Sequence, residues 1–491
     1  MKEQNSFYIT TTLPYVNAPL HMGHALEFIR ADVIARYKKL LGFDVYFNTG
    51  TDEHGLKIFE KAESLNLAPK EFVDKSFEDF KESIKIFGLD QSILHFVRTT
   101  DSKHIKAAQE FWKKCDKNGY IYKKNYQTKY CVGCESEKQD HELSEKGECP
   151  DHPDRKLEII DEENYFFKYS EFTDKLKNFY AENKDFVIPD FRFNEIKAFV
   201  ERGLHDFSIS RLKEKMPWGI PVPGDEKHVM YVWFDALVNY ISTLGWPFDP
   251  AQGKPEENLF EKYWVNGMPT QYCGKDNLRF QSAMWQAMLM AAGVSNSKQI
   301  IINGFITADG GVKMSKTLGN VVDPTEIVKE YGTDALRYFL LREVGSFEDS
   351  PFTMERFKDA YNSGLANGLG NLTSRIMTMA VNYDVKLSKE ELDIKYFSEK
   401  KEDLENFNIH KYINWIWECM GRLDEFIQKN EPFKKIKIDE EGAKKDVHYL
   451  LHHLYKATLA IEPMLPETSK KIQELIRENK KPEKPLFLRK E

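Results

Sequence analysis

Cysteine is scarce in the sequence, and long apolar runs are missing. Six cysteines are spread over 491 residues, which excludes the dense disulfide scaffold of a small secreted protein. The longest apolar candidate, MLMAAGV at residues 288–294, is far shorter than the roughly twenty residues of a membrane-spanning helix. The N-terminal segment MKEQNSFYITTT has neither the basic start nor the apolar centre of a signal peptide. We therefore expect a cytoplasmic protein without membrane attachment.

An excess of basic residues is also missing. Lys and Arg number 70 against 78 Asp and Glu, for a formal net charge of -8, so the broad positive surface of a general nucleic-acid coat is excluded. A nucleic acid bound through local basic patches is still allowed. The chain is too long for one ordinary core, so we expect several packed units.

The order of strand-like and helical segments predicts a parallel α/β layer. Residues 7–12 favour a short strand, apolar residues recur at helical spacing from Ala25, and FDVYFNTGTDEHG has the character of a second buried strand. The strand-like segments HVMYVWFD, TQYCGKD and QIIINGFI follow much later and are expected to complete the sheet. From about Glu355 helical patterns continue, which predicts a separate bundle. We expect the tail RENKKPEKPLFLRKE to be frayed or loosely docked.

His21 and His24 flank Gly23 where the first helix is predicted to begin. Residues three apart share a helix face, so a metal pair is possible, although nothing nearby in sequence supplies an obvious third ligand. The second interpretation is a phosphate site, because a helix N-terminus presents free N–H groups and a positive dipole end. Gly23 would then leave room for the ligand. Two surface histidines near a helix cap are the third interpretation.

A second cationic segment is ADGGVKMSKTLGN. Lys313 and Lys316 lie three apart in a glycine-flanked loop, with Ser315 between them, and would form a mobile clamp for a polyphosphate. An ordinary exposed loop is the alternative.

His-x-Gly-His and Lys-Met-Ser-Lys together resemble the signature pair of the class I aminoacyl-tRNA synthetases. The resemblance implies a Rossmann-like sheet in which both motifs flank the phosphates of ATP while an amino-acid carboxylate attacks the α-phosphate. Thr317 stands where the family often has serine, and it keeps the hydroxyl. The residues that would bind ATP are His21, Gly23, His24, Lys313, Ser315 and Lys316, and the catalytic ones among them would be His21, His24, Lys313 and Lys316.

Five segments are similar to the methionyl-tRNA synthetase family: TTLPYVNAPLHMGH, GTDEHG, YVWFDALVNY, GKDNLRFQ and NGFITADGGVKMSKT. By this resemblance Asp52 holds the substrate ammonium, as a carboxylate can, although capping of a turn is a competing role. Aromatic faces and aliphatic walls suit a polarizable thioether, with plain core packing as the alternative. The residues that would line the methionine pocket are Leu13, Tyr15, Trp233, Ala236 and Tyr240.

Two positions depart from the family pattern. Gln281 stands where many members have histidine near the methionine, and Leu237 stands where proline is common. We include Gln281 in the methionine site because it could orient Tyr240 or Tyr15 by hydrogen bonding.

The spacing Cys131-x2-Cys134, then Cys149-x2-His152, predicts a structural Zn²⁺ site. Two tight ligand pairs fill all four tetrahedral positions, so the metal would fold a small domain and leave no position for catalysis. Disulfides are the alternative, disfavoured in a reducing cytoplasm, and His141 is a substitute for His152. The family resemblance likewise implies a zinc-bearing connective insertion.

The helical region is expected to meet tRNA. Asn371 and Arg375 lie four apart on one helix face and could offer hydrogen bonds and a guanidinium plane to unstacked bases. By resemblance they read the anticodon, together with Phe433, which stands where the family typically has tryptophan. A solvated basic face is the alternative.

The combined prediction is an α/β protein with a Rossmann-like parallel sheet split by a zinc-bearing connective insertion and followed by an all-α bundle. The resemblance implies that methionine and ATP give methionyl-adenylate, with Mg²⁺ accompanying ATP, and that the methionyl group passes to the 3'-terminal adenosine of tRNA(Met). The alternatives are a class I synthetase for another amino acid and a non-catalytic tRNA-binding paralogue. We expect a monomer. The predicted ranges are 1–116 and 226–325 for the catalytic halves, 117–225 for the insertion, 326–355 for a stem-contact linker and 356–491 for the anticodon-binding domain.

Overall fold

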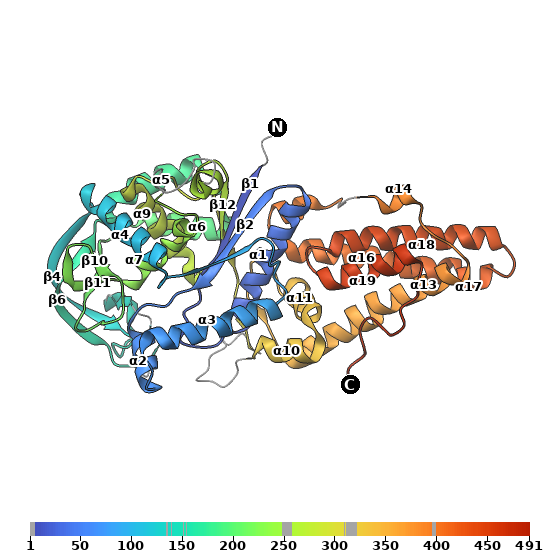
Figure 1. Cartoon of the computed structure of the whole chain (residues 1–491), viewed down its shortest axis with the longest axis horizontal. Coiled ribbons are helices and arrows are strands. Elements are labelled where there is room, and N and C mark those ends of the chain that lie inside the picture. Colours follow the sequence, from blue (N-terminus) through green and yellow to red (C-terminus); the bar gives the residue numbers. More distant parts are fainter. Residues whose placement is uncertain are drawn as a thin grey trace.

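The N-terminal half of the protein is built on a parallel β-sheet, seen here in a computed structural model (Figure 1). The structure describes residues 5–133, 136–138, 140–150, 152–153, 155–247, 258–308, 310, 322–394 and 399–491. Within these ranges the sheet has six strands, in the spatial order β3 (Leu94–Arg98), β2 (Asp44–Thr51), β1 (Ser6–Thr11), β12 (Met268–Gly274), β13 (Gln299–Asn303) and β7 (Val187–Ile188). Every pairing between them is parallel.

The strand order reverses at the middle of this sheet. From β1 the chain moves outward through β2 to β3, whereas β12 and β13 add to the opposite edge of β1. Ligands of such sheets bind in the crevice outside the carboxyl ends of the strands at the reversal point. We therefore expect the ligand site to lie beside the residues that follow Thr11 and Gly274.

Helices flank the sheet, and α1 is buried on almost all sides. The helices of this half are α1 (Met22–Leu40), α2 (Leu56–Ser64), α3 (Pro69–Ile86), α4 (Ser102–Lys117), α5 (Thr173–Glu182), α6 (Asp190–Glu201), α7 (Val232–Ala236), α8 (Asn239–Ser242), α9 (Trp285–Ala292), α10 (Pro324–Tyr331) and α11 (Thr333–Arg342). A short parallel pair, β14 (Ile306–Thr307) with β15 (Ser350–Pro351), follows the main sheet.

Two small antiparallel sheets lie between the halves of the parallel sheet in sequence. The first has the order β5 (Ser136–Lys138), β4 (Ile121–Cys131), β6 (Glu158–Phe167), β8 (Phe207–Ser208), and the second has the order β10 (Pro221–Val222), β11 (Asp225–Met230), β9 (Ser210–Leu212). The polar, turn-rich composition of this region is thus explained by a fold of its own, as expected. Residues 187–188, inside the range assigned to the insertion, return to the parallel sheet as β7.

One predicted strand is wrong in part. In HVMYVWFD the strand β11 ends at Met230 and belongs to an antiparallel sheet, and the chain then turns into α7. Aromatic and β-branched residues favour a strand there, but Asp235 is fully buried and is bound by two histidines from other elements. Tertiary contacts therefore override the local preference.

The C-terminal part is helical, as predicted (Figure 1). Its helical segments are α12 (Met354–Ala360), η8 (Tyr361–Gly370), α13 (Asn371–Asn382), α14 (Lys389–Leu392), α15 (Lys401–Glu405), α16 (Ile409–Asn430), α17 (Pro432–Lys435), α18 (Glu440–Ile461) and α19 (Pro466–Glu478). The predicted fold class, an α/β sheet with an insertion and a helical bundle, is confirmed. Within the described ranges, no helix is both long enough and apolar enough to span a membrane.

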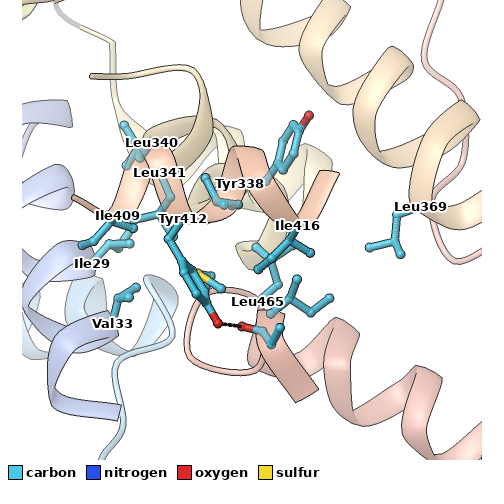
Figure 2. Close-up of a cluster of buried hydrophobic side chains, with 14 of the residues drawn as sticks. Ile29, Val33, Tyr338, Leu340, Leu341, Leu369, Ile409, Tyr412, Ile416 and Leu465 are labelled. Carbon is cyan, nitrogen blue, oxygen red and sulfur yellow. Dashed lines mark hydrogen bonds between the residues drawn. The ribbon is translucent and has the colours of Figure 1, made fainter. Parts of the chain in front are cut away.

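One apolar cluster joins the two parts of the molecule (Figure 2). It contains residues of α1, of α11 and of the bundle: Ile29, Val33, Tyr338, Leu340, Leu341, Leu369, Ile409, Tyr412, Ile416 and Leu465. Burial of such side chains contributes about 1.5–3 kcal/mol each, so the bundle is packed firmly against the helix that begins at the histidine motif.

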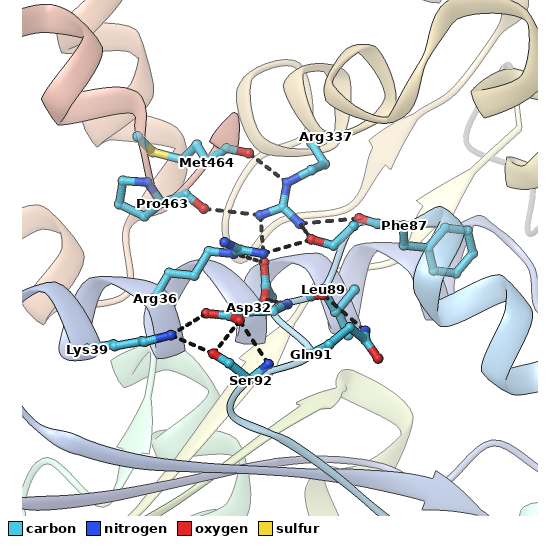
Figure 3. A network of polar contacts seen from close by, with 12 residues as sticks. Asp32, Arg36, Lys39, Phe87, Leu89, Gln91, Ser92, Arg337, Pro463 and Met464 are labelled. Atoms are coloured by element: carbon cyan, nitrogen blue, oxygen red, sulfur yellow. Dashed lines mark hydrogen bonds and ion pairs between the residues drawn. The ribbon is translucent and has the colours of Figure 1, made fainter. Parts of the chain in front are cut away.

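A buried polar network lies at the same junction (Figure 3). Asp32 of α1 accepts hydrogen bonds from Arg36 and Arg337, each at 2.7 Å. Arg337 also donates to the carbonyl oxygens of Met464 at 2.7 Å and Pro463 at 3.1 Å, in the turn between α18 and α19. Asp32 and Arg337 are fully buried, so each needs the other's charge.

Of the two states expected for the C-terminal tail, frayed or loosely docked, the structure shows a docked one. The hydroxyl of Tyr361 donates to the carbonyl of Leu488 at 2.9 Å, and Asn362 exchanges two hydrogen bonds with the backbone of Lys490. Phe487 packs edge-on against the ring of Tyr361. The polar composition of the tail gives no indication of these contacts.

Candidate active site

His21 and His24 form the N-terminal cap of α1. The Nδ1 atom of His21 accepts a hydrogen bond from the backbone of Gly23 at 3.1 Å, and Nδ1 of His24 accepts one from the backbone of His21 at 3.3 Å. The two rings stack with centroids 3.8 Å apart. Because both Nδ1 atoms accept, each ring in its neutral form carries its proton on Nε2. The helix terminus thus presents imidazole N–H donors beside its own positive dipole end.

Gly23 leaves room for the ring of His21. A Cβ atom at this position would lie 3.0 Å from Cε1 and 3.1 Å from Nδ1 of His21. Besides the room for a ligand that we expected, Gly23 leaves room for the neighbouring imidazole.

Glu27, one turn into α1, is a buried carboxyl group at the candidate site that the sequence motifs did not indicate. Its Oε1 accepts from the backbone N of Thr12 at 2.7 Å and from the Thr12 hydroxyl at 2.5 Å. Burial raises the pKa of Glu27 to about 8, and the charge of Asp276 acts in the same direction, while the bonds from Thr12 oppose it. The carboxyl groups of Glu27, on α1, and of Asp276, just after β12, therefore influence each other near the reversal point of the sheet.

Asp52 is placed by the backbone of the neighbouring loop. Its N–H donates to the carbonyl of Pro14 at 3.0 Å, and its carbonyl accepts from the N–H of Val16 at 3.3 Å. These bonds join the turn after β2 to the loop after β1, so that Tyr15 and Asp52 face each other as a single parallel bridge. Two residues predicted for one site are thereby brought together.

The predicted pocket residues downstream lie on α7 and α8. Trp233 is partly exposed and stacks on Phe280 with centroids 3.8 Å apart and planes 5° apart, whereas Ala236 and Tyr240 are buried. Leu13, in the loop after β1, is partly buried. Burial raises the pKa of Tyr240, so its hydroxyl stays neutral and can donate a proton.

Gln281 orients Tyr240, as we expected. Its Nε2 donates to the Tyr240 hydroxyl oxygen at 2.6 Å, and its Oε1 accepts from Nε2 of Gln271 at 2.7 Å. Gln271 accepts in turn from the hydroxyl of Ser297 at 2.5 Å. This chain of bonds fixes which end of the Gln281 amide faces Tyr240, and the Tyr240 proton remains available for another acceptor.

Comparison with known proteins identifies the family. The profile described as tRNA synthetases class I (M) matches residues 7–158 and 152–377. The methionine–tRNA ligase of Caldanaerobacter subterraneus subsp. tengcongensis is 40% identical over 487 residues, covering 96% of this chain and 74% of the relative. That of Thermotoga maritima is 37% identical over 497 residues, covering 97% and 76%. The chain belongs to the methionyl-tRNA synthetase family.

A solved structure of the same family has the same fold. Methionyl-tRNA synthetase of Mycobacterium tuberculosis in complex with methionyl-adenylate superposes with a TM-score of 0.86 at 33% identity, covering 96% of this chain and 94% of that one. The chain is therefore a class I aminoacyl-tRNA synthetase, a methionine–tRNA ligase. The family prediction made from the motifs is confirmed, while the residue roles within the site stay predictions.

Four predicted residues of this methionyl-tRNA synthetase lie outside the described ranges: Cys134, Lys313, Ser315 and Lys316. The remaining three metal ligands are brought together. Ligand atoms of Cys131, Cys149 and His152 lie within 4.8 Å of one another, and both cysteines are fully buried. Two thiols and an imidazole are ligands that Zn²⁺ prefers, so the donor set fits the metal. A Cβ on Gly133 would lie 2.4 Å from the His152 ring, so a larger residue at this position would displace the imidazole.

The predicted anticodon residues lie on the bundle. Asn371 is the exposed first residue of α13, and Arg375, one turn later, pairs with Asp424 of α16. Phe433, on α17 just after α16 ends, is 45% exposed. An aromatic side chain left in solvent beside Lys434 suits a stacked base.

Proposed function

We propose that His21 and His24, with Lys313 and Lys316, stabilise the transition state in which the methionine carboxylate attacks the α-phosphate of ATP. Pyrophosphate leaves as methionyl-adenylate forms. The observation that carries this proposal is the doubly capped N-terminus of α1, which presents two imidazoles at the reversal point of the sheet. Preorganised N–H donors aimed at developing charge are the main source of catalysis in such a step.

Gly23 and Ser315 complete the proposed ATP site, and Glu27 and Asp276 are placed to receive a polar part of the nucleotide. Mg²⁺ would supply positive charge to the ATP phosphates. In the second step the ribose 2'-hydroxyl of the terminal adenosine of tRNA attacks the methionyl carbonyl, and AMP leaves.

The methionine site follows from the same geometry. Asp52 would pair with the α-ammonium group, and the side chain would lie among Leu13, Tyr15, Trp233, Ala236 and Tyr240, with Gln281 holding Tyr240. The tight link between the loops that carry Tyr15 and Asp52 supports a single pocket.

Zn²⁺ is proposed as a structural ion held by Cys131, Cys134, Cys149 and His152, and its bonds would stabilise the small sheet that contains β4. Asn371, Arg375 and Phe433 are proposed to bind anticodon bases of tRNA(Met). A monomer, a cytoplasmic location and the five predicted domain ranges belong to the same proposal.

The experiment for this proposal is amino-acid-dependent exchange of labelled pyrophosphate into ATP with each of the twenty amino acids. We expect exchange with methionine alone. Exchange with another amino acid would contradict the pocket assignment and implicate Gln281 and Leu237. No exchange by folded, zinc-loaded protein would favour a tRNA-binding paralogue.

The anticodon assignment needs a separate test. Arg375→Ala should slow aminoacylation of tRNA at least tenfold and leave pyrophosphate exchange unchanged, because only the tRNA step uses the bundle. Arg422→Ala, on the exposed surface of α16, is the matched control and should change neither rate. Equal losses of both activities in Arg375→Ala would refute the assignment.

A further inference from the structure

We propose that His54, Asp235 and His104 form a positioning unit that fixes the distance between the ammonium end and the side-chain end of the methionine pocket. The unit thereby sets the length of side chain that the enzyme activates. The three residues are called the Asp235 cluster below. The inference rests on the proposed function, which assigns the two ends of the pocket.

The Asp235 cluster joins three separate elements through one buried carboxylate. Oδ2 of Asp235, on α7, lies 2.8 Å from Nδ1 of His54, which follows β2. Oδ1 lies 2.9 Å from Nε2 of His104, on α4. The other ring nitrogen of His104 lies 2.9 Å from the hydroxyl of Ser242, on α8. All four side chains are buried.

The cluster holds a charged carboxylate. Burial alone would raise the pKa of Asp235, but His54 and His104 outweigh it and bring the pKa below its ordinary value. A buried carboxylate deprived of its partners costs several kcal/mol. Both oxygens of Asp235 are used, so the carboxylate can move away from neither histidine without that cost.

The sequence neighbours of the cluster are the predicted pocket residues. His54 comes two positions after Asp52, and Asp235 lies between Trp233 and Ala236. The contact between His54 and Asp235 therefore links the loop that carries Asp52, at the proposed ammonium end of the pocket, to the helix that carries Trp233 and Ala236, at the proposed side-chain end. A longer distance between Nδ1 of His54 and Oδ2 of Asp235 would move one end of the pocket relative to the other.

The element that carries Asp235 depends on such anchors. α7 has only five residues, too few for a helix to be stable by itself. Further along the same segment, Asn48 donates to Asn239 at 3.1 Å and Tyr46 donates to the carbonyl of Thr243 at 3.1 Å. These two bonds align α8 with β2, but the Asp235 cluster is the link adjacent in sequence to Trp233 and Ala236.

The test compares methionine with two analogues in pyrophosphate exchange: norleucine, in which a methylene replaces sulfur, and ethionine, which is one methylene longer. His54→Leu removes the donor at similar volume. His54→Asn keeps an N–H group near the position of Nδ1 and should retain the hydrogen bond to Asp235. His228→Gln is the control, because His228 is equally buried and is bound to Asp225 at 3.0 Å on β11, outside the cluster.

We expect His54→Leu to raise the KM for methionine at least tenfold and to lower the methionine-to-ethionine ratio of kcat/KM by a similar factor, with kcat changed much less. His54→Asn should stay within threefold of the wild type. His228→Gln should leave the ratio unchanged, whatever it does to stability. If His54→Leu does not fold, Asp235→Asn replaces it, since the amide keeps the volume and offers one acceptor in place of two.

An unchanged ratio in folded His54→Leu, or in the Asp235→Asn variant that replaces it, would overturn the proposal, as would an equal loss for all three substrates. Wild-type protein without methionine-dependent exchange would refute the proposed function instead. The two failures are therefore distinguishable.

Discussion

A methyl group at Gly23 would lie 3.0 Å from Cε1 and 3.1 Å from Nδ1 of His21, so the ring would have to shift by a few tenths of an ångström. Gly23→Ala should therefore displace the imidazole, break the bond from the Gly23 backbone to its Nδ1 and lower kcat for pyrophosphate exchange at least tenfold, with little change in the KM for methionine. Gly421→Ala is the matched control, because Gly421 lies within α16 and has no neighbouring atom within 4 Å of the added carbon. That variant should keep full activity and gain about 0.5–1 kcal/mol of stability. A fully active Gly23→Ala would contradict the catalytic role of His21.

Glu27 makes stability depend on pH. Its pKa is raised from 4.5 to about 8, so between these values the folded protein holds a proton that the unfolded chain has released. The free energy of unfolding should then fall as pH rises, by about 1.4 kcal/mol per pH unit from this group. Glu27→Gln removes the titration and should flatten the dependence of melting temperature on pH between 5.5 and 8. Parallel curves for the two proteins would show that Glu27 is charged when folded.

The sequence allowed some of these residues to be predicted, but not others. His21 and His24 were placed correctly at the start of α1 because their spacing around a glycine precedes a helical pattern. Glu27 was missed because a glutamate in a helix ordinarily faces solvent, and its contact with Thr12 depends on how α1 packs against the end of β1. Asp235 was hidden for the same reason, since its partners are more than a hundred residues away.

The proposed Zn²⁺ would stabilise the small sheet that begins with β4, so losing one of its ligands should unfold this insertion first. Cys149→Ser should release the bound metal, measured by mass spectrometry or a chelating dye, and expose β4 to proteolysis. Cys419→Ser, on α16, should change neither. Gly133→Ala should have a weaker effect of the same kind, because its Cβ displaces the ring of His152. Unchanged metal content in Cys149→Ser would refute the ligand assignment.

Elements differed in how well local pattern predicted them. β1, α1 and β2 follow their hydrophobic patterns closely, since each is long and buried in a uniform way. β7 has two residues, too few to show any periodicity, and α7 is held by its buried aspartate rather than by helix propensity. Short elements are thus defined by what surrounds them.

The junction between the sheet and the bundle depends on Arg337. Arg337→Met should lower the free energy of unfolding by about 3 kcal/mol. Buried Asp32 would keep only Arg36 and the backbone N–H of Asp90 as partners, and the four carbonyl groups that Arg337 binds, those of Phe87, Gly88, Pro463 and Met464, would each lose a donor. In calorimetry the variant should begin to separate into two transitions as the bundle loosens. Lys39→Met is the control, since Lys39 pairs with Asp90 at a solvent-exposed position and should contribute less than about 1 kcal/mol. A single unshifted transition for Arg337→Met would refute this role.

The division into an α/β part and a helical part was predicted because hydrophobic periodicity changes along the chain. The joint between them could not be predicted, because Asp32, Arg337 and Pro463 are far apart in sequence and become partners only once three separate segments are packed together.

The two neighbours of β1 are made at very different times during synthesis. β2 emerges soon after β1, but β12 begins about 220 positions beyond the end of β2. At roughly 5–20 residues per second, the second edge of β1 stays open for about 10–40 s on the ribosome. During that interval the nascent chain presents an unpaired apolar edge strand, which is a template for wrong pairing. Newly made chains of this enzyme should therefore depend on chaperones until β12 has been synthesised and has paired with β1.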